Sequence, residues 1–148
     1  MTVFSSLSIP ASALTAQRLR MDVISSNIAN AETTRGRYVN GEWVPYRRKM
    51  VVLEPKENSF SSYLNTEISR QGAGGVKVTR IVEDPSPFQL VYDPDHPDSG
   101  EDGYVRYPNV DPLREMVDLI SATRSYEANV TTFNAAKGML MKALEIGK

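Results

Sequence analysis

The segment at residues 93–102, DPDHPDSGED, gathers the side chains that could do chemistry, because it sets the only histidine of the chain, His96, among five carboxylates. Imidazole and carboxylate groups can bind a metal ion or exchange protons with a substrate. The spacing departs from the calcium-binding loop, since Pro97 occupies a ligand position and Tyr104 stands where that loop places its bidentate glutamate. Alternating proline and aspartate is typical of turns. We therefore expect a turn-rich loop here rather than a metal site or an acid–base site.

Other catalytic patterns are missing from the sequence. The chain has no cysteine, which excludes disulfides, thiolate metal sites and thiol catalysis. A single histidine in an acidic loop does not suit a serine triad. The glycine cluster at residues 72–75 lacks the strand–turn–helix context of a phosphate-binding loop. The sequence predicts neither an enzyme nor a bound cofactor or metal.

Charge is nearly balanced over the chain, with a formal net charge of −1, so no overall field favours nucleic acid or an anionic membrane. The charge is uneven along the chain, however. Residues 47–49 form a basic cluster without the interleaved aromatics of a nucleic-acid surface, whereas residues 83–102 hold seven acidic groups and no Lys or Arg. The basic cluster is either a solvated strand face or one half of an electrostatic contact between neighbouring copies. The residues expected in that contact are Arg47, Arg48, Lys49, Asp93, Asp95 and Asp98.

An apolar repeat predicts a long helix over residues 4–31. Its positions recur in steps of three, four or seven residues, a helical period close to a heptad. Pro10 lies near the start, where a helix tolerates proline best. Asn30 could end the helix in the left-handed conformation. Asn30 and the serines and asparagine before it could also bond to neighbouring helices or satisfy carbonyls at the helix end, and simple fraying into a loop is the alternative. The apolar positions one heptad apart are Leu7, Leu14, Met21 and Ile28.

A second repeat predicts a helix over residues 111–147. Asp111 and Pro112 form a suitable start, with an acceptor side chain followed by proline at the first helical position. A further apolar stripe begins at Leu113, Val117 and Ile120. The apolar positions one heptad apart are Leu119, Tyr126, Phe133 and Leu140.

Two such helices carry more apolar surface than one partner can cover, because each has more than one stripe. We expect them to pair as a coiled-coil hairpin and to bury the remaining stripes against other subunits. A four-helix bundle with a solvated outer face is the alternative, but the middle of the chain offers no further helix.

The middle of the chain predicts a small antiparallel β-rich region with long loops, and hence the α+β class. Asn40 and Gly41 give a two-residue hairpin signal between two short apolar runs. Residues 74–84 alternate, and we expect them to pair with residues 87–94 across a proline-rich turn. Residues 56–75 are polar and glycine-rich and predict a mobile loop. The expected division is an N-terminal helix (1–35), a β-rich region (36–110) and a C-terminal helix (111–148).

The two end regions together resemble the bacterial flagellar axial proteins, the rod and hook family. At the N-terminal end, SSNIANAETT carries Ala29, Asn30 and Thr33 of the family signature. The matching C-terminal positions are Glu115, Met116, Val117, Ile120, Arg124, Tyr126, Glu127, Ala128, Asn129 and Lys137. The middle segments PYRRK, DPSPFQLVYDPDHPD and DGYVRYPNV, with the short length, resemble the proximal-rod members of the family.

This resemblance implies a structural subunit of the basal-body rod that contacts copies of itself and other rod subunits. It also implies export by the flagellar type III apparatus, with no cleaved signal peptide, no membrane insertion and no nucleic acid partner. The sequence shows no secretory signal and no membrane-length apolar run, as that route requires. With the eight heptad residues, Asn30, Thr33 and Asn129 are expected at the assembly interface. A secreted type III effector or soluble binding module with an amphipathic helical hairpin is the alternative.

Overall fold

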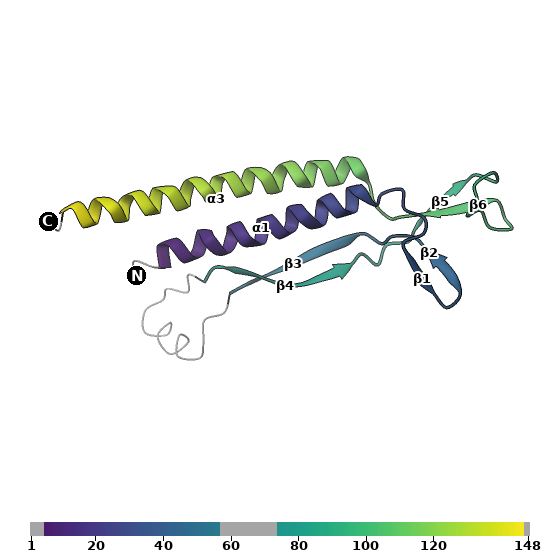
Figure 1. Ribbon diagram of the computed structural model, residues 1–148, viewed down its shortest axis with the longest axis horizontal. Helices are drawn as coiled ribbons and strands as arrows, with labels where there is room; N and C mark the ends of the chain where they lie inside the picture. The colour runs from purple at the N-terminus through teal and green to yellow at the C-terminus, as the bar shows by residue number, and fades with distance from the viewer. Residues whose placement is uncertain (1–4, 57–73, 147–148) are drawn as a thin grey trace. The chain divides into compact units, whose positions relative to one another are not determined.

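The computed structural model describes residues 5–56 and 74–146, so the expected mobile loop at residues 56–75 lies almost entirely outside the described residues. Figure 1 shows two helices and pairs of strands along the chain, which confirms the α+β class. The elements are α1 (Ser5–Ala29), β1 (Arg37–Val39), β2 (Glu42–Val44), β3 (Lys49–Pro55), β4 (Val76–Glu83), β5 (Gln89–Tyr92), β6 (Tyr104–Tyr107) and α3 (Pro112–Ile146).

The chain divides into two compact units, and the division crosses both helices. Within the described residues, unit 1 comprises residues 5–19, 52–56, 74–80 and 122–146. Unit 2 comprises residues 20–51 and 81–121. In unit 1, the Ser12 hydroxyl accepts a hydrogen bond from the Val76 amide at 3.1 Å and donates to the Ile9 carbonyl at 2.7 Å. This hydroxyl therefore ties the first half of α1 to the start of β4.

The C-terminal end of α1 is capped by a side chain and not by a residue in the left-handed backbone conformation. The side-chain amide nitrogen of Asn30 donates to the Ser26 carbonyl at 2.8 Å, and the Asn30 backbone amide donates to the same carbonyl at 3.2 Å, so this residue bonds twice to the last turn of the helix. The expected left-handed conformation of Asn30 is wrong, because Asn40 is the only described non-glycine residue with a positive φ. The expectation that asparagine satisfies carbonyls at this end is confirmed.

The start of α3 follows the predicted capping pattern. The Asp111 carboxylate accepts hydrogen bonds from the backbone amides of Leu113 at 3.0 Å and Arg114 at 3.4 Å, and Pro112 begins the helix. These bonds satisfy two of the amides that have no partner within a helix. Glu115 in the first turn places a negative charge near the positive end of the helix dipole.

The predicted hairpin at Asn40 and Gly41 is confirmed. Strands β1 and β2 are antiparallel, and both turn residues have positive φ, 52° and 92°, the backbone that an Asn-Gly turn adopts between twisted strands. Tyr38 lies opposite Trp43, with ring centroids 5.2 Å apart. The two rings contact each other across the hairpin and stabilise it, and both remain exposed to solvent.

The predicted pairing of residues 74–84 with residues 87–94 is wrong. Strand β4 bonds to β3, and β5 pairs with β6, so the described strands form three two-stranded sheets. The intervening segment bends because Asp84 accepts hydrogen bonds from the backbone amide and the hydroxyl of Ser86, at 2.9 and 2.6 Å. Pro85 and Pro87 beside it have no amide hydrogen to donate to a ladder.

The described core of one copy is small. Its buried apolar side chains are mainly alanine and valine, namely Ala16, Val23, Ile24, Val105, Val110, Ala122 and Ala136. Small side chains let backbones approach closely but bury little area each. Many larger apolar side chains stay exposed on the same copy. Among the described residues, no helix combines the length and the apolar content needed to span a bilayer.

Candidate functional site

Unit 2 contains a polar cluster in which Asn27 and Glu115 are buried and Arg48, Asp84 and Asn109 are half-buried. Asn27 is fully buried near the end of α1. Its side-chain nitrogen donates to the Lys49 carbonyl at 2.9 Å and to a Glu115 carboxylate oxygen at 3.0 Å. Its oxygen accepts from the Lys49 amide and the Tyr46 hydroxyl, both at 3.0 Å. With all four bonds made, one side chain joins α1 to β3 and α3, and burying it carries no unpaired polar group.

Arg48 provides the positive charge of the polar cluster. Its Nε atom lies 2.6 Å from Oε1 of Glu115, a carboxylate with no exposed side-chain surface. Its two terminal nitrogens face Asp84 at 3.4 Å and Asp118 at 3.6 Å. Asp118 also lies 3.5 Å from Arg20 of α1. A guanidinium group suits this position because its planar fork can serve several acceptors at once.

Asn109 bonds to the backbone of the two segments that carry Arg48 and Asp84. Its side-chain oxygen accepts from the Arg48 amide at 2.8 Å. Its nitrogen donates to the carbonyls of Asp84 at 3.3 Å and Ser86 at 3.2 Å. Asn109 therefore holds the segment after β4 against the start of β3, and so it positions the Asp84 carboxylate beside Arg48.

The charges in the polar cluster shift one another's proton affinity. Burial on its own lowers the pKa of Arg48, but the hydrogen bonds and charges of Glu115 and then Asp84 outweigh it, so the pKa is raised overall. Hydrogen bonds from Ser86 lower the pKa of Asp84, and the Arg48 guanidinium lowers it further. Both groups are therefore held in their charged forms at neutral pH.

The polar cluster also sets the direction of the helices within unit 2. Asn27 bonds to Glu115, and Arg20, two turns earlier in α1, faces Asp118, which comes later in α3. The residue that comes earlier in α1 thus contacts the residue that comes later in α3, and this order shows that the two helix segments run antiparallel. Hydrogen bonds between fully buried partners tolerate little displacement, so the polar cluster fixes the register between these helix segments.

The acidic loop at residues 93–103 forms a turn structure, as predicted. The Asp98 carboxylate accepts hydrogen bonds from Thr34 at 2.7 Å and from Arg35 at 2.6 Å. These bonds, first that of Arg35 and then that of Thr34, lower the pKa of Asp98. His96 accepts from the Asp98 amide through Nδ1 at 3.0 Å. The described residues contain no group of three His, Cys, Asp or Glu side chains arranged to hold a metal ion.

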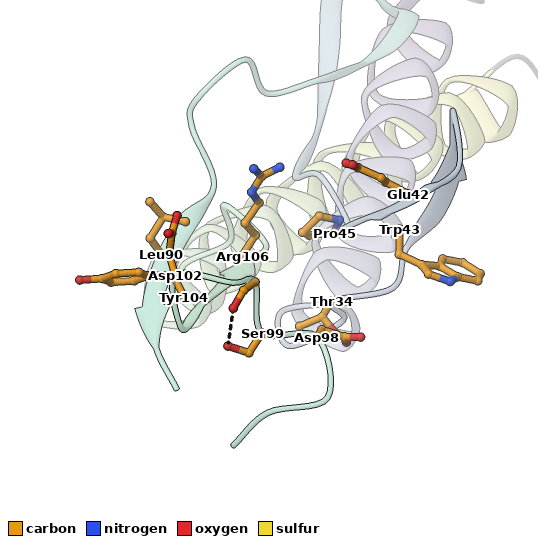
Figure 2. Close-up of a pocket in the computed structure, with 11 residues that line it drawn as sticks. Thr34, Glu42, Trp43, Pro45, Leu90, Asp98, Ser99, Asp102, Tyr104 and Arg106 are labelled. Carbon is orange, nitrogen blue, oxygen red and sulfur yellow. Dashed lines mark hydrogen bonds between the residues drawn. The ribbon is translucent and has the colours of Figure 1, made fainter. Parts of the chain in front are cut away.

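A cavity of about 560 Å³ lies between the β1–β2 hairpin and the β5–β6 hairpin of unit 2. Figure 2 shows Asp98 beside Thr34 at its edge, with the Trp43 ring turned away from the other lining side chains. Its lining includes the carboxylates Glu42, Asp98 and Asp102 and one cation, Arg106. The arrangement is an acidic, open surface rather than an enclosed site for a small molecule.

The structure separates the residues expected in an electrostatic contact into two groups. Arg48 and Asp98 are engaged in ion pairs within the same copy. Arg47, Lys49, Asp93 and Asp95 have no ion pair among the described residues.

The residues expected at a helical interface are partly covered in one copy. All eight heptad positions are half-buried, namely Leu7, Leu14, Met21, Ile28, Leu119, Tyr126, Phe133 and Leu140. Asn129 donates to the Ser125 carbonyl of its own helix at 2.7 Å. Thr33 accepts from the Tyr46 amide through its backbone carbonyl at 3.0 Å. Thr33 therefore helps to shape the loop after α1 within the copy.

The first turns of α3 carry an exposed apolar stripe formed by Leu113, Met116, Val117 and Ile120. The spacing of three and four residues places these side chains on one helix face. Leu113 is 75% exposed and Val117 is 66% exposed, while Glu115 on the opposite face is fully buried. An apolar face of this kind is typical of a surface that another helix covers.

Sequence reasoning did not place Asn27, Asn109 and Glu115 in a polar cluster. Asn27 and Glu115 lie beside apolar repeats and would ordinarily be exposed. The available signal was their position inside the two end segments that resemble the axial family. Arg48 belongs to the basic cluster at residues 47–49, but its partners lie 36 and 67 residues away in sequence.

The comparisons with known proteins agree at both ends of the chain. A family profile described as "Flagella basal body rod protein" matches residues 7–36, and one described as "Flagellar basal body rod FlgEFG protein C-terminal" matches residues 101–146. The chain is thus a flagellar basal-body rod protein.

Relatives that match over the full length of the chain identify one family among the rod proteins. The chain is 68% identical to the flagellar basal-body rod protein FlgC of Bacillus subtilis, with all of both chains covered. It is 45% identical to FlgC of Borreliella burgdorferi, over 99% of this chain and 98% of that one. It is 39% identical to FlgC of Salmonella typhimurium over all of both chains. The chain belongs to the FlgC family of flagellar basal-body rod proteins, which is a structural family.

Proposed function

We propose that the protein is a structural subunit of the proximal rod and that it polymerises through its terminal helices. Its partners are copies of itself and other rod subunits, and the flagellar type III apparatus exports it. Membership of the FlgC family supports the rod assignment. The apolar stripe of α3 is the observation that carries the mode of polymerisation, because it remains exposed in one copy.

The pairing of α1 and α3 as a coiled-coil hairpin belongs to the same proposal. It is supported by the heptad spacing of both helices and by the antiparallel contacts of Asn27 and Arg20 with α3 in unit 2. Such a hairpin presents the apolar stripe on the face away from Glu115. A helix from a neighbouring subunit then covers it, and burying a side chain such as Leu113 contributes about 1.5–3 kcal/mol.

The small side chains of α1 suit passage through a narrow export channel. A helix with many serine, alanine and asparagine residues has little contact energy when it is alone, so it unfolds easily before assembly. The polar cluster then forms when α1, β3 and α3 come together in the folded subunit.

A pair of substitutions at Val117 tests the proposal. Val117→Asp places a charge in the apolar stripe, and Val117→Ile keeps it apolar at nearly the same size. In cells that lack the native gene, the Ile variant should appear in purified basal bodies and restore motility. The Asp variant should be produced and folded but absent from the basal body. Normal incorporation of the Asp variant would contradict polymerisation through this stripe.

A further inference from the structure

A basic cavity of about 180 Å³ lies in unit 2, and it shares Pro45 with the lining of the acidic cavity. Three cations line it, Arg37, Arg47 and Lys49, with a single carboxylate, Glu83. The Arg37 and Glu83 side chains are 3.9 Å apart and both are largely exposed, so their ion pair is weak. The cavity therefore keeps an excess of positive charge and has room for a carboxylate with bound water.

Arg47 and Lys49 are held in place without an ion pair to any other described residue. The Arg47 guanidinium donates to the Asp84 carbonyl at 3.3 Å and lies 4.6 Å from the centre of the Phe88 ring. The Lys49 ammonium lies 5.4 Å from the centre of the Tyr46 ring. Contacts with carbonyls and rings orient a cation but leave its charge available. Oriented, unpaired cations are suited to bind an anionic partner, because little side-chain freedom remains to be lost.

The complementary surface is the start of the acidic loop, at residues 93–95. Asp95 is exposed, and neither it nor Asp93 forms an ion pair among the described residues. Backbone bonds hold the loop in shape, since the Asp93 amide donates to the Gly103 carbonyl at 3.0 Å and the Ser99 amide to the His96 carbonyl at 2.9 Å. The Asp98 bonds to Thr34 and Arg35 anchor its far side. The loop is thus a preformed acidic projection.

We propose that Asp93 and Asp95 of one copy enter the basic cavity of a second copy and pair with Arg47 and Lys49. This inference rests on the proposed function, because a rod brings copies side by side. The two surfaces occupy different places on unit 2, so the contact is head-to-tail. Contacts of this kind continue from copy to copy and produce rings or helical assemblies rather than closed two-fold dimers, and a rod requires the helical form. The pairing sets the register between copies, while the helices provide most of the buried area.

Charge complementarity on a single chain favours a second copy as the occupant. The cavity has excess positive charge and the loop has unpaired negative charge, yet no ion pair joins them within the described part of one copy. A different rod subunit is the competing occupant. The experiments below distinguish these occupants.

Cysteine substitution provides a direct test, because the chain has no native cysteine. Basal bodies carrying both Lys49→Cys and Asp95→Cys in every copy are treated with a short bismaleimide linker. Arg37, Arg47 and Asp93 remain to hold the contact. The expected product is a ladder of linked copies, because each copy offers both positions. A mixture of the two single variants should give dimers only, and Lys77→Cys with Asp95→Cys should give no ladder.

Charge reversal gives a second readout that does not depend on cross-linking. Lys49→Glu and Asp95→Lys should each reduce rod incorporation, and the double variant should recover it. Absence of the ladder and of this rescue, in rods that assemble normally, would overturn the inference and leave the proposed function intact. Cross-linking of the Lys49→Cys variant to another rod subunit would also overturn it. Failure of the unmodified protein to enter rods would instead overturn the proposed function.

Discussion

The polar cluster and the apolar stripe lie on opposite faces of the same turns of α3, and they differ in what completes them. Both polar atoms of the Asn27 side chain find partners within the copy, and Glu115 is fully buried. Leu113 and Val117, by contrast, remain mostly exposed. Hydrogen bonds are directional, and a buried polar group needs its partners within the folded chain. The hydrophobic effect is non-directional, so apolar surface can stay exposed on one copy and be buried later by another molecule. Polar groups thus fix the geometry of one copy, and the apolar stripe stays exposed on it, which is what the proposed polymerisation requires.

Removing the Glu115 carboxylate should have the largest effect on the isolated protein. Glu115→Ala removes the nearest carboxylate partner of Arg48 and one of the two acceptors of the buried Asn27 side-chain nitrogen, which costs about 3–5 kcal/mol of unfolding free energy. The loss is measured by denaturant titration. Glu127→Ala on the exposed part of the same helix is the matched control and should change stability by less than about 0.5 kcal/mol. Equal losses for the two variants would show that the polar cluster does not stabilise the subunit.

Asn27→Ala should come next. The substitution removes four hydrogen bonds and leaves the Lys49 amide and carbonyl without their side-chain partner, at a cost of about 1–3 kcal/mol per buried group left unsatisfied. Asn134→Ala, at an exposed position of α3, is the control and should be nearly neutral. Thermal unfolding monitored by circular dichroism compares the two. A neutral Asn27 variant would mean that water replaces the lost bonds.

Acid should weaken the polar cluster more gradually. The pKa of Asp84 is lowered in the folded protein, so its stabilising contribution is present above the unfolded pKa of about 4 and is lost as the pH falls through the lower folded value. Arg48 stays protonated throughout this range. The stability of the native protein should therefore decline below about pH 4, with a shallower decline for Asp84→Asn. Parallel pH profiles for the two proteins would contradict this assignment.

The same contrast explains what could be predicted from the sequence. Local chemistry determines the Asp111 cap, the Asn40–Gly41 turn and the period of both helices, and these predictions are confirmed. The bend at Asp84 is also local, because Ser86 bonds to its carboxylate. The pairing of β4 with β3 instead involves contacts far along the chain, since Arg48 and Asn109 bond to Asp84, and no local pattern predicts those partners. The burial of Asn27 and Glu115 was missed for the same reason, since each is satisfied only by residues from other elements.

Truncating the apolar stripe should have the smallest effect on the isolated protein and the clearest effect on the rod. Leu113→Ala removes a side chain that is 75% exposed in one copy, so the unfolding free energy of the monomer should change by less than about 0.5 kcal/mol. On the proposed mode of polymerisation a neighbouring subunit covers the same side chain in the rod, so its loss should lower the amount incorporated. Glu115→Ala should do the opposite: it should lower the unfolding free energy of the monomer strongly, and any loss of rod incorporation should follow from that instability. A clear loss of unfolding free energy in the Leu113→Ala monomer would show that Leu113 stabilises the single copy. The apolar stripe would then not be distinct from the polar cluster in its effect on the monomer.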